Sequence, residues 1–213
     1  SSCIRTDLPP SVHVSGVTRF QHTAQPDWDW WGRLWPAPGE TLRALGIREG
    51  TTVAEVGCGN GYFALPAARI TDPGTVYALD IDQSLLDELA DLAALQEIEN
   101  IESLCCDARE LTRELPEPVD CVVIANTFHG VSDQTGLVRA AFDALAPDGR
   151  LVLVNWHDEP SEQTTVAGEP RGPPRDLRMY PAETESAVVE AAGFTLSEHV
   201  ELPPYHYALV FER

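Results

Sequence analysis

The sequence predicts an α/β domain in which helices cover both faces of a doubly wound, mostly parallel sheet. Short apolar runs alternate along most of the chain with amphipathic segments of helical length. Clusters of glycine, proline and aspartate separate these segments where the chain must turn. The length of 213 residues fits one such domain with an embellishment.

A glycine turn between a strand and a helix is the central feature of the chain. Residues 52–56 form a short apolar run typical of a buried parallel strand, and residues 62–70 carry apolar side chains at helical spacing. Gly57, Gly59 and Gly61 lie between them. Because glycine has no Cβ, the backbone there can turn tightly and a ligand can lie against it. The turn therefore suits a polar ligand held by backbone N–H groups.

A carboxylate two residues before the first glycine indicates which ligand fits. Glu55 accepts hydrogen bonds but repels phosphate, whereas the dinucleotide fingerprint places a pyrophosphate at the helix N-terminus. A nicotinamide-dependent dehydrogenase is therefore a disfavoured alternative, and a ligand with a cationic amino group fits better. The string EVGCGNG resembles the first motif of the class I S-adenosylmethionine-dependent methyltransferases. In that family the glycine loop holds the methionine part of the cofactor.

The resemblance implies a fold, a cofactor and a set of binding residues. The family has a Rossmann-like seven-stranded sheet with a C-terminal antiparallel strand, and its reaction converts S-adenosylmethionine into S-adenosylhomocysteine. We expect residues 39–213 to form this S-adenosylmethionine-binding domain and residues 1–38 to form an N-terminal arm and possible lid. At the first strand the resemblance implies cofactor contacts from Glu55, Gly57, Cys58, Gly59 and Gly61.

The segment before the first strand is rich in tryptophan. It contains Trp28, Trp30, Trp31 and Trp35. Large aromatic side chains usually serve burial, so most of them are expected to pin the segment to the domain. One or two could instead belong to a lid over the cofactor. Residues 40–45 predict a short helix that ends before the first strand.

The second predicted strand, residues 75–79, ends in Asp80 and Ile81. By resemblance, Asp80 accepts hydrogen bonds from both ribose hydroxyls, and Ile81 is a further cofactor contact. The alternative is a solvated acidic loop, which is common in so acidic a chain. Asp82 is expected to cap the amphipathic helix that is predicted over residues 85–95.

The third predicted strand, residues 101–106, is followed by Asp107 and Ala108. By resemblance, these two residues form the adenine end of the site, where the acid accepts from the adenine amino group. Ligands bind at the carboxyl edge of open α/β sheets. We therefore expect Glu55, Asp80 and Asp107 to contact one ligand.

The fourth predicted strand, residues 119–125, ends in Asn126. In the family this strand ends beside the departing methyl group, so we expect Asn126 to contact cofactor or substrate. His129 is the candidate general base, because its unperturbed pKa lies near neutrality. It could equally cap or pack within its loop. The segment lacks the Asn/Asp-Pro-Pro-aromatic motif of the methyltransferases that act on amino groups of DNA and glutamine.

The remaining chain completes the sheet and adds a long connection. We expect a helix at 137–145, a turn at 146–150, a strand at 151–154, a helix at 181–192 and an antiparallel pair of strands at 194–202 and 205–211. Residues 156–180 are rich in proline and glycine, and such long loops are often functional. We expect this connection to cover the substrate. Arg171, Arg175 and Arg178 could hold a carboxylate or phosphate there, or pair with the acidic surface.

Composition limits the partners and the compartment. The formal net charge is −20 and all 14 basic residues are arginine, a halophilic-type acidic surface that disfavours nucleic acid as a substrate. The five cysteines fit neither a disulfide framework nor a zinc pattern, so we expect no metal and a cytoplasmic location. Cys58, Cys105, Cys106 and Cys121 fall in or beside predicted buried strands. No apolar run approaches a membrane span, so no membrane partner is expected.

The predicted function is an enzyme, an S-adenosylmethionine-dependent methyltransferase that acts on a small molecule. One alternative keeps the reaction but changes the acceptor to a protein or RNA. Another is a non-catalytic module that only binds S-adenosylmethionine. A thiol-dependent arsenic methyltransferase is disfavoured, because Cys105 and Cys106 alternate faces of a predicted strand.

Overall fold

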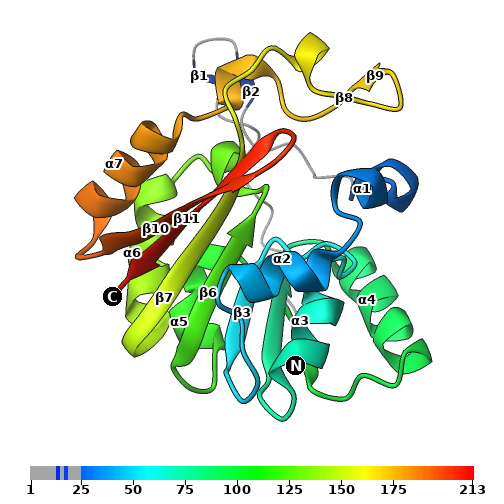
Figure 1. The fold of residues 1–213 in the computed structure, drawn as a ribbon. Coiled ribbons are helices and arrows are strands. Elements are labelled where there is room, and N and C mark those ends of the chain that lie inside the picture. Colours follow the sequence, from blue (N-terminus) through cyan, green and yellow to red (C-terminus); the bar gives the residue numbers. More distant parts are fainter. Residues whose placement is uncertain (1–12, 15–16, 19–24) are drawn as a thin grey trace.

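The computed structural model describes residues 13–14, 17–18 and 25–213, so most of the predicted N-terminal arm lies outside the described residues. A seven-stranded sheet with the order β10-β11-β7-β6-β3-β4-β5 forms the centre of the molecule (Figure 1). Its strands are β3 (Val53–Val56), β4 (Val76–Asp80), β5 (Ile101–Cys105), β6 (Val119–Ala125), β7 (Leu145–Trp156), β10 (Thr195–Leu202) and β11 (His206–Glu212). Strands β7, β6, β3, β4 and β5 are parallel, and β11 runs antiparallel to both of its neighbours. The predicted Rossmann-like seven-stranded sheet with a C-terminal antiparallel strand is confirmed.

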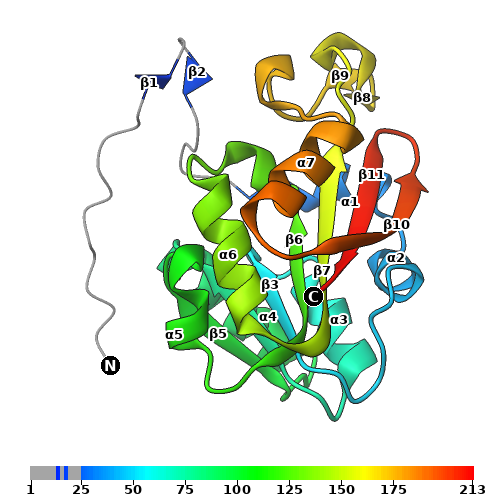
Figure 2. The same cartoon turned by 90° about the vertical axis from the view of Figure 1, so that its left-hand side faces the viewer.

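Helices cover both faces of this sheet (Figures 1 and 2). One face carries α2 (Pro38–Ala44), α3 (Ala64–Thr71) and α4 (Gln83–Leu95), and the other carries α5 (Leu111–Glu114), α6 (Gln134–Ala144) and α7 (Pro181–Ala191). Side chains alternate across each strand, so Val123 packs into one apolar core while Val122 and Ile124 pack into the other. The two cores explain why the central strands are apolar throughout.

The predicted helices and strands of the domain are present with small shifts at their ends. As predicted, the Asp82 side chain caps α4 by accepting a hydrogen bond from the Ser84 N–H. The predicted turn at 146–150 lies inside β7 rather than before it. Leu145 pairs with Val119 but Arg150 pairs with Cys121, so the residues between them bulge out of register.

The prediction that Cys105 and Cys106 belong to a buried strand is wrong. Strand β5 is an edge strand with only one neighbour, and both side chains are half-buried. Cys58 and Cys121 are buried as expected, Cys121 in the central strand β6 and Cys58 in the loop that follows β3. Cys58 and Cys121 form no disulfide bond.

Several short elements lie beyond the carboxyl ends of the parallel strands (Figures 1 and 2). They are α1 (Trp28–Leu34), η1 (Ala108–Glu110), η2 (Phe128–Gly130), η3 (Ser161–Gln163), β8 (Thr165–Val166), β9 (Glu169–Pro170) and η4 (Arg175–Leu177). A further two-stranded pair joins β1 (His13–Val14) and β2 (Val17–Thr18).

None of these short elements was predicted. The Asp27 side chain caps α1, and the 156–180 connection carries the β8–β9 hairpin instead of remaining irregular. Helix α1 contacts β8, so the N-terminal segment and the long connection meet at this edge of the sheet. Within the described residues, no helix combines the length and the apolar character that a membrane crossing requires.

Candidate functional site

The carboxyl ends of neighbouring strands bring the predicted acids to one edge of the sheet. Strands β3 and β4 pair in parallel with Val56 beside Leu79, so Glu55 and Asp80 lie at adjacent strand ends. Strand β5 continues the edge, because Asp80 pairs with Cys105 just before Asp107. This common edge follows directly from the parallel arrangement of the strands.

Glu55 is a buried carboxyl group with an unsatisfied atom. Its side chain is 4% exposed, and its Oε2 has no hydrogen-bond partner. Burial, helped by the negative charge of Asp80, raises the pKa of Glu55 to about 8. A cationic group placed beside this carboxyl would supply the missing donor and favour its ionised form.

The glycine loop that follows Glu55 is held tightly against β4. The N–H groups of Gly57 and Cys58 both donate to the Leu79 carbonyl, at 2.8 and 3.0 Å. Gly57 has a φ of +70°, and a Cβ there would lie 2.6 Å from Oγ1 of Thr127. The loop after β3 therefore packs directly on the loop after β6, which only glycine permits.

Gly59 and Gly61 allow different neighbours to approach the loop. Gly59 has a φ of +56°, and a Cβ there would overlap the Gln25 side chain. At Gly61 a Cβ would crowd Leu65 and Leu89, so this glycine allows α3 and α4 to approach. The close approach at Gly59 is therefore made by the N-terminal segment.

Asp80 clamps the glycine loop. Its Oδ2 accepts the Gly59 N–H and its Oδ1 accepts the Asp82 N–H, both at 2.9 Å. The side chain is buried, which raises its pKa, while these two backbone hydrogen bonds act in the opposite direction. A carboxylate has further lone pairs, so Asp80 can still accept from hydroxyl groups of a ligand. Ile81, which is partly exposed, follows it.

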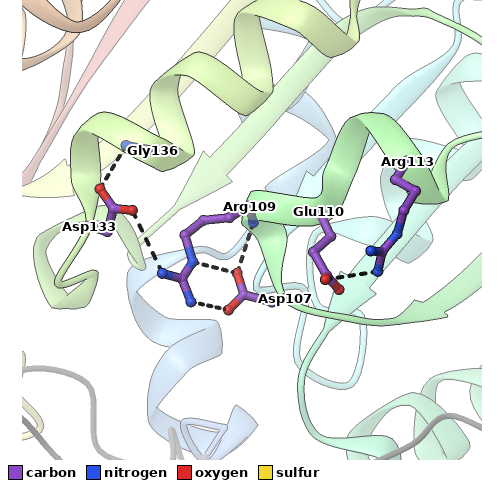
Figure 3. Close-up of polar contacts among 6 residues, drawn as sticks. All are labelled: Asp107, Arg109, Glu110, Arg113, Asp133 and Gly136. Atoms are coloured by element: carbon purple, nitrogen blue, oxygen red, sulfur yellow. Dashed lines mark hydrogen bonds and ion pairs between the residues drawn. The ribbon is translucent and has the colours of Figure 1, made fainter. Parts of the chain in front are cut away.

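Asp107 is engaged in an ion pair with Arg109 (Figure 3). The guanidinium donates to both carboxylate oxygens, at 3.0 and 2.7 Å, and the Arg109 N–H adds a third hydrogen bond. These contacts hold the pKa of Asp107 below its usual range. The same guanidinium lies 3.7 Å from Asp133, which caps α6 (Figure 3). Ala108 follows as the first residue of η1.

Asn126 ends β6 with an unsatisfied side chain. Its φ of +59° is in the left-handed region, and its N–H donates to the Val154 carbonyl at 2.7 Å. Both polar atoms of its amide are buried without a partner. An amide in this state can offer one donor and one acceptor group to a ligand.

His129 lies in η2, three residues further along the chain. Its Nδ1 is buried and has no partner. Burial, followed by the positive charge of Arg178, lowers the pKa of His129 to about 4. The imidazole is therefore neutral at pH 7, and a neighbouring anion would raise its pKa and strengthen it as a base.

The N-terminal segment rests on the glycine loop through contacts that sequence reasoning missed. The Asn60 N–H donates to Oε1 of Gln25 at 3.3 Å, and Nε1 of Trp28 donates to Oδ1 of Asn60 at 3.0 Å. Trp31 and Trp35 are buried, as the packing interpretation predicted, whereas Trp28 is half-buried. Asn60 within the glycine string was the only signal in the sequence for this contact.

His206 on β11 was also missed. It is 1% exposed, and its Nε2 has no partner. The ring lies 4.2 Å from that of Trp156 and 4.6 Å from that of Trp35. No motif surrounds His206 in the sequence, and only the pairing of β11 with β7 brings it to this edge. Across residues 13–14, 17–18 and 25–213, no group of histidine, cysteine, aspartate and glutamate is arranged to hold a metal ion.

Comparison with known proteins identifies this arrangement. A family model described as a methyltransferase domain matches residues 53–149, which include Glu55, the glycine loop, Asp80, Asp107 and Asn126. Over these residues the chain is similar to the class I S-adenosylmethionine-dependent methyltransferases. This family uses S-adenosylmethionine as its methyl donor.

Curated proteins are similar to this chain over a longer stretch. The ubiquinone/menaquinone biosynthesis C-methyltransferase UbiE of Pseudomonas putida is 29% identical over 166 residues, which cover 70% of this chain and 61% of that protein. The chain thus spans about three fifths of the length of these curated relatives.

Solved structures share the methyltransferase fold. A SAM-dependent methyltransferase from Aquifex aeolicus has a TM-score of 0.73 at 23% identity, covering 85% of this chain and 92% of that one. The [4+2]-cyclase SpnF has a TM-score of 0.65 at 16% identity, covering 82% and 81%. Because the fold also belongs to a protein named as a cyclase, the fold alone does not determine the reaction.

Proposed function

We propose that this chain binds S-adenosylmethionine at the carboxyl edge of its sheet and transfers the methyl group to a small molecule. The observation that carries the proposal is the buried, unsatisfied carboxyl of Glu55 beside the glycine loop. A buried polar atom without a partner is costly, and the cationic α-amino group of the cofactor would satisfy it.

We propose the following binding residues around this contact. Gly57, Cys58 and Gly59 contact the methionine part, because they come just after Glu55, where β3 ends. Asp80 accepts from the ribose hydroxyls with the lone pairs that its two backbone contacts leave over. Ile81 packs against the same sugar. Gly61 supports the loop through helix packing.

The adenine and methyl ends follow along the same edge. Asp107 accepts from the adenine amino group while retaining Arg109, and Ala108 provides a small contact beside the base. The side chain of Asp107 is 29% exposed, which leaves room for this further donor. Asn126 offers its unpaired amide where β6 ends, on the side of the methyl group.

The chain's own residues position the reactants and exclude water. When bound, S-adenosylmethionine supplies an electrophilic methyl group. The segment that includes Gln25 and Trp28 covers the glycine loop, and alignment of the acceptor with the methyl group can supply much of the rate. His129 is the candidate base that takes a proton from the acceptor at Nδ1 when the reaction releases one.

A small acceptor is supported by two features. The charge of −20 disfavours nucleic acid, and α1 and the 156–180 connection lie over the edge of the sheet where the methyl group would be presented. The relatives named for ubiquinone and menaquinone biosynthesis also act on small molecules, as their names state. We place the reaction in the cytoplasm, because the number and spacing of the cysteines fit no disulfide framework.

Calorimetry with S-adenosylmethionine and S-adenosylhomocysteine tests the binding part of this proposal. We expect one saturable site for each compound, and absence of heat with both would reject the proposal. A methyl-transfer screen with carboxylate, amine, hydroxyl and thiol acceptors tests the reaction. Turnover on proteins or RNA alone would assign a macromolecular substrate, and binding without turnover on any acceptor would assign a non-catalytic module.

A further inference from the structure

A closed chain of contacts joins residues at the carboxyl edge of the sheet, beyond the proposed cofactor residues. The Arg171 guanidinium lies 4.9 Å from the Trp30 ring, which contacts Trp31 at 5.3 Å. Trp31 lies 6.4 Å from His206, and His206 lies 4.2 Å from Trp156. The Arg178 guanidinium is 5.2 Å from the Trp156 ring, and its Nη2 donates to the Arg171 carbonyl at 3.2 Å, which completes the circuit.

Arg178 is the unusual member of this circuit. It is 5% exposed, yet none of the ion pairs between described residues includes it, although the chain carries 34 acidic residues. Its guanidinium is held by neutral acceptors instead, because Nε donates to the Pro173 carbonyl at 3.0 Å and Nη2 to the Thr164 hydroxyl at 3.0 Å. Its Nη1 has no partner. The carboxylates of Glu159, Asp158 and Glu162 act on this charge, but none is within ion-pair distance. An incoming anion would supply the direct contact that the buried guanidinium lacks.

The unsatisfied atoms around Arg178 are mainly donors. Nη1 of Arg178, Nε of Arg171 and Nε1 of Trp35 are buried N–H groups without an acceptor. These groups cannot accept hydrogen bonds, so a partner that satisfies them must present acceptor oxygen atoms. Nε2 of His206 and Nδ1 of His129 are also unpaired, and a neutral imidazole nitrogen can act as donor or acceptor.

We propose that the methyl acceptor is a small aromatic carboxylate whose carboxylate group binds Arg178 within the circuit of tryptophan and histidine rings. This inference rests on the proposed function and specifies its substrate. The guanidinium provides the geometry and charge that carboxylates prefer, and the indole rings provide an apolar surround for the arene. His129 is close enough to Arg178 to respond to its charge, and it lies three residues beyond Asn126. His129 thereby connects Arg178, which would bind the carboxylate, with Asn126, which is proposed to lie beside the methyl group.

Arg175 provides an internal contrast. It belongs to the same connection and has the same side chain, but it is exposed and pairs with Asp158 at 3.4 Å. Its charge is therefore already compensated, and it has no part in the proposed contact. A substitution of Arg175 measures what the loss of any positive charge from this segment does to anion binding.

A binding experiment on the full chain saturated with S-adenosylhomocysteine tests this inference. The probes are 4-hydroxybenzoate and the uncharged 4-hydroxybenzamide, titrated by ligand-observed NMR. We expect the carboxylate to bind at least tenfold tighter than the amide. We expect Arg178→Gln to remove this difference, Arg178→Lys to restore part of it, and Arg175→Gln to leave it unchanged.

Three results would overturn the inference. They are equal binding of the two probes to the unaltered chain, unchanged discrimination in Arg178→Gln, and a loss of S-adenosylhomocysteine affinity in Arg178→Gln. The last result would show that Arg178 holds the carboxylate of the cofactor instead. The far-ultraviolet circular dichroism spectrum of each variant shows that it is folded. A failure of the unaltered chain to bind S-adenosylhomocysteine would instead reject the proposed function itself.

Discussion

Glu55 and Asp80 end neighbouring parallel strands, and both carboxyl groups are buried at the same edge of the sheet. Asp80 has two backbone N–H donors, whereas Oε2 of Glu55 has none. The difference explains their separate roles in our account. In this account Asp80 holds the glycine loop in the ligand-free chain. Glu55 lacks a donor there, so it favours a ligand with a cationic group.

The pH dependence of cofactor binding follows from the pKa of about 8 at Glu55. Below that pKa most molecules carry a neutral Glu55, and a cationic amino group binds its ionised form. The affinity for S-adenosylhomocysteine should therefore rise about tenfold between pH 6 and pH 7, with release of close to one proton on binding. Calorimetry in buffers with different ionisation enthalpies measures both quantities. An affinity that does not change over this interval would contradict the role of Glu55.

Glu55→Gln should change how the stability of the ligand-free chain depends on pH. The pKa of Glu55 is raised in the folded chain, so its ionisation destabilises the fold progressively as pH rises from about 4.5 to about 8. The free energy of unfolding of the variant should equal that of the unaltered chain near pH 4. Above pH 8 it should be larger, by on the order of 4 kcal/mol. Urea unfolding of the ligand-free chain at both pH values measures this difference. A variant that is less stable at high pH would show that Glu55 has a stabilising partner.

Asp80→Ala should weaken cofactor binding by about 1–3 kcal/mol, as expected for hydrogen bonds to a charged acceptor. It should also lower the melting temperature, because the N–H groups of Gly59 and Asp82 lose their acceptor. Asp91→Ala, on the exposed side of α4, is the matched control. Calorimetry and thermal unfolding measure the two effects. Unchanged affinity would show that the ribose lies elsewhere.

Much of this candidate site could be predicted from the sequence, because its residues stand at the ends of strands that follow one another along the chain. Glu55, the glycines and Asp80 are fixed by the succession of strand, turn, helix and strand. Helix α1 and the position of His206 could not be predicted in this way. They depend on contacts between distant segments, such as Trp28 with Asn60 and His206 with Trp156. The edge position of β5, which exposes Cys105, likewise follows from strand order rather than from local pattern.

Gly59→Ala should reduce cofactor affinity by at least tenfold. A Cβ at this residue, which we propose to contact the methionine part, would meet Gln25, and the φ of +56° is strained for alanine. Gly168→Ala is the control, because Gly168 also has a positive φ, of +83°, but no atom within 4 Å of the added Cβ. The control should lose stability without losing affinity. Equal affinity losses in both variants would attribute the effect to backbone strain alone.

The acidic surface predicts a salt-dependent stability. With a formal net charge of −20 and no lysine, the folded chain repels itself at low ionic strength. The melting temperature should fall when salt is removed and rise again when sodium chloride is restored. Differential scanning calorimetry across a salt series measures this. A melting temperature that is independent of salt would reject the halophilic-type interpretation of the surface.

The most direct test of the central claim compares two ligands on two proteins. S-adenosylhomocysteine and its analogue without the α-amino group are titrated by calorimetry into the unaltered chain and into Glu55→Gln. We predict that removal of the amino group weakens binding to the unaltered chain at least tenfold and has little further effect on the variant, because the two partners of one contact are then both missing. Equal losses in the two proteins would show that the amino group and Glu55 do not meet.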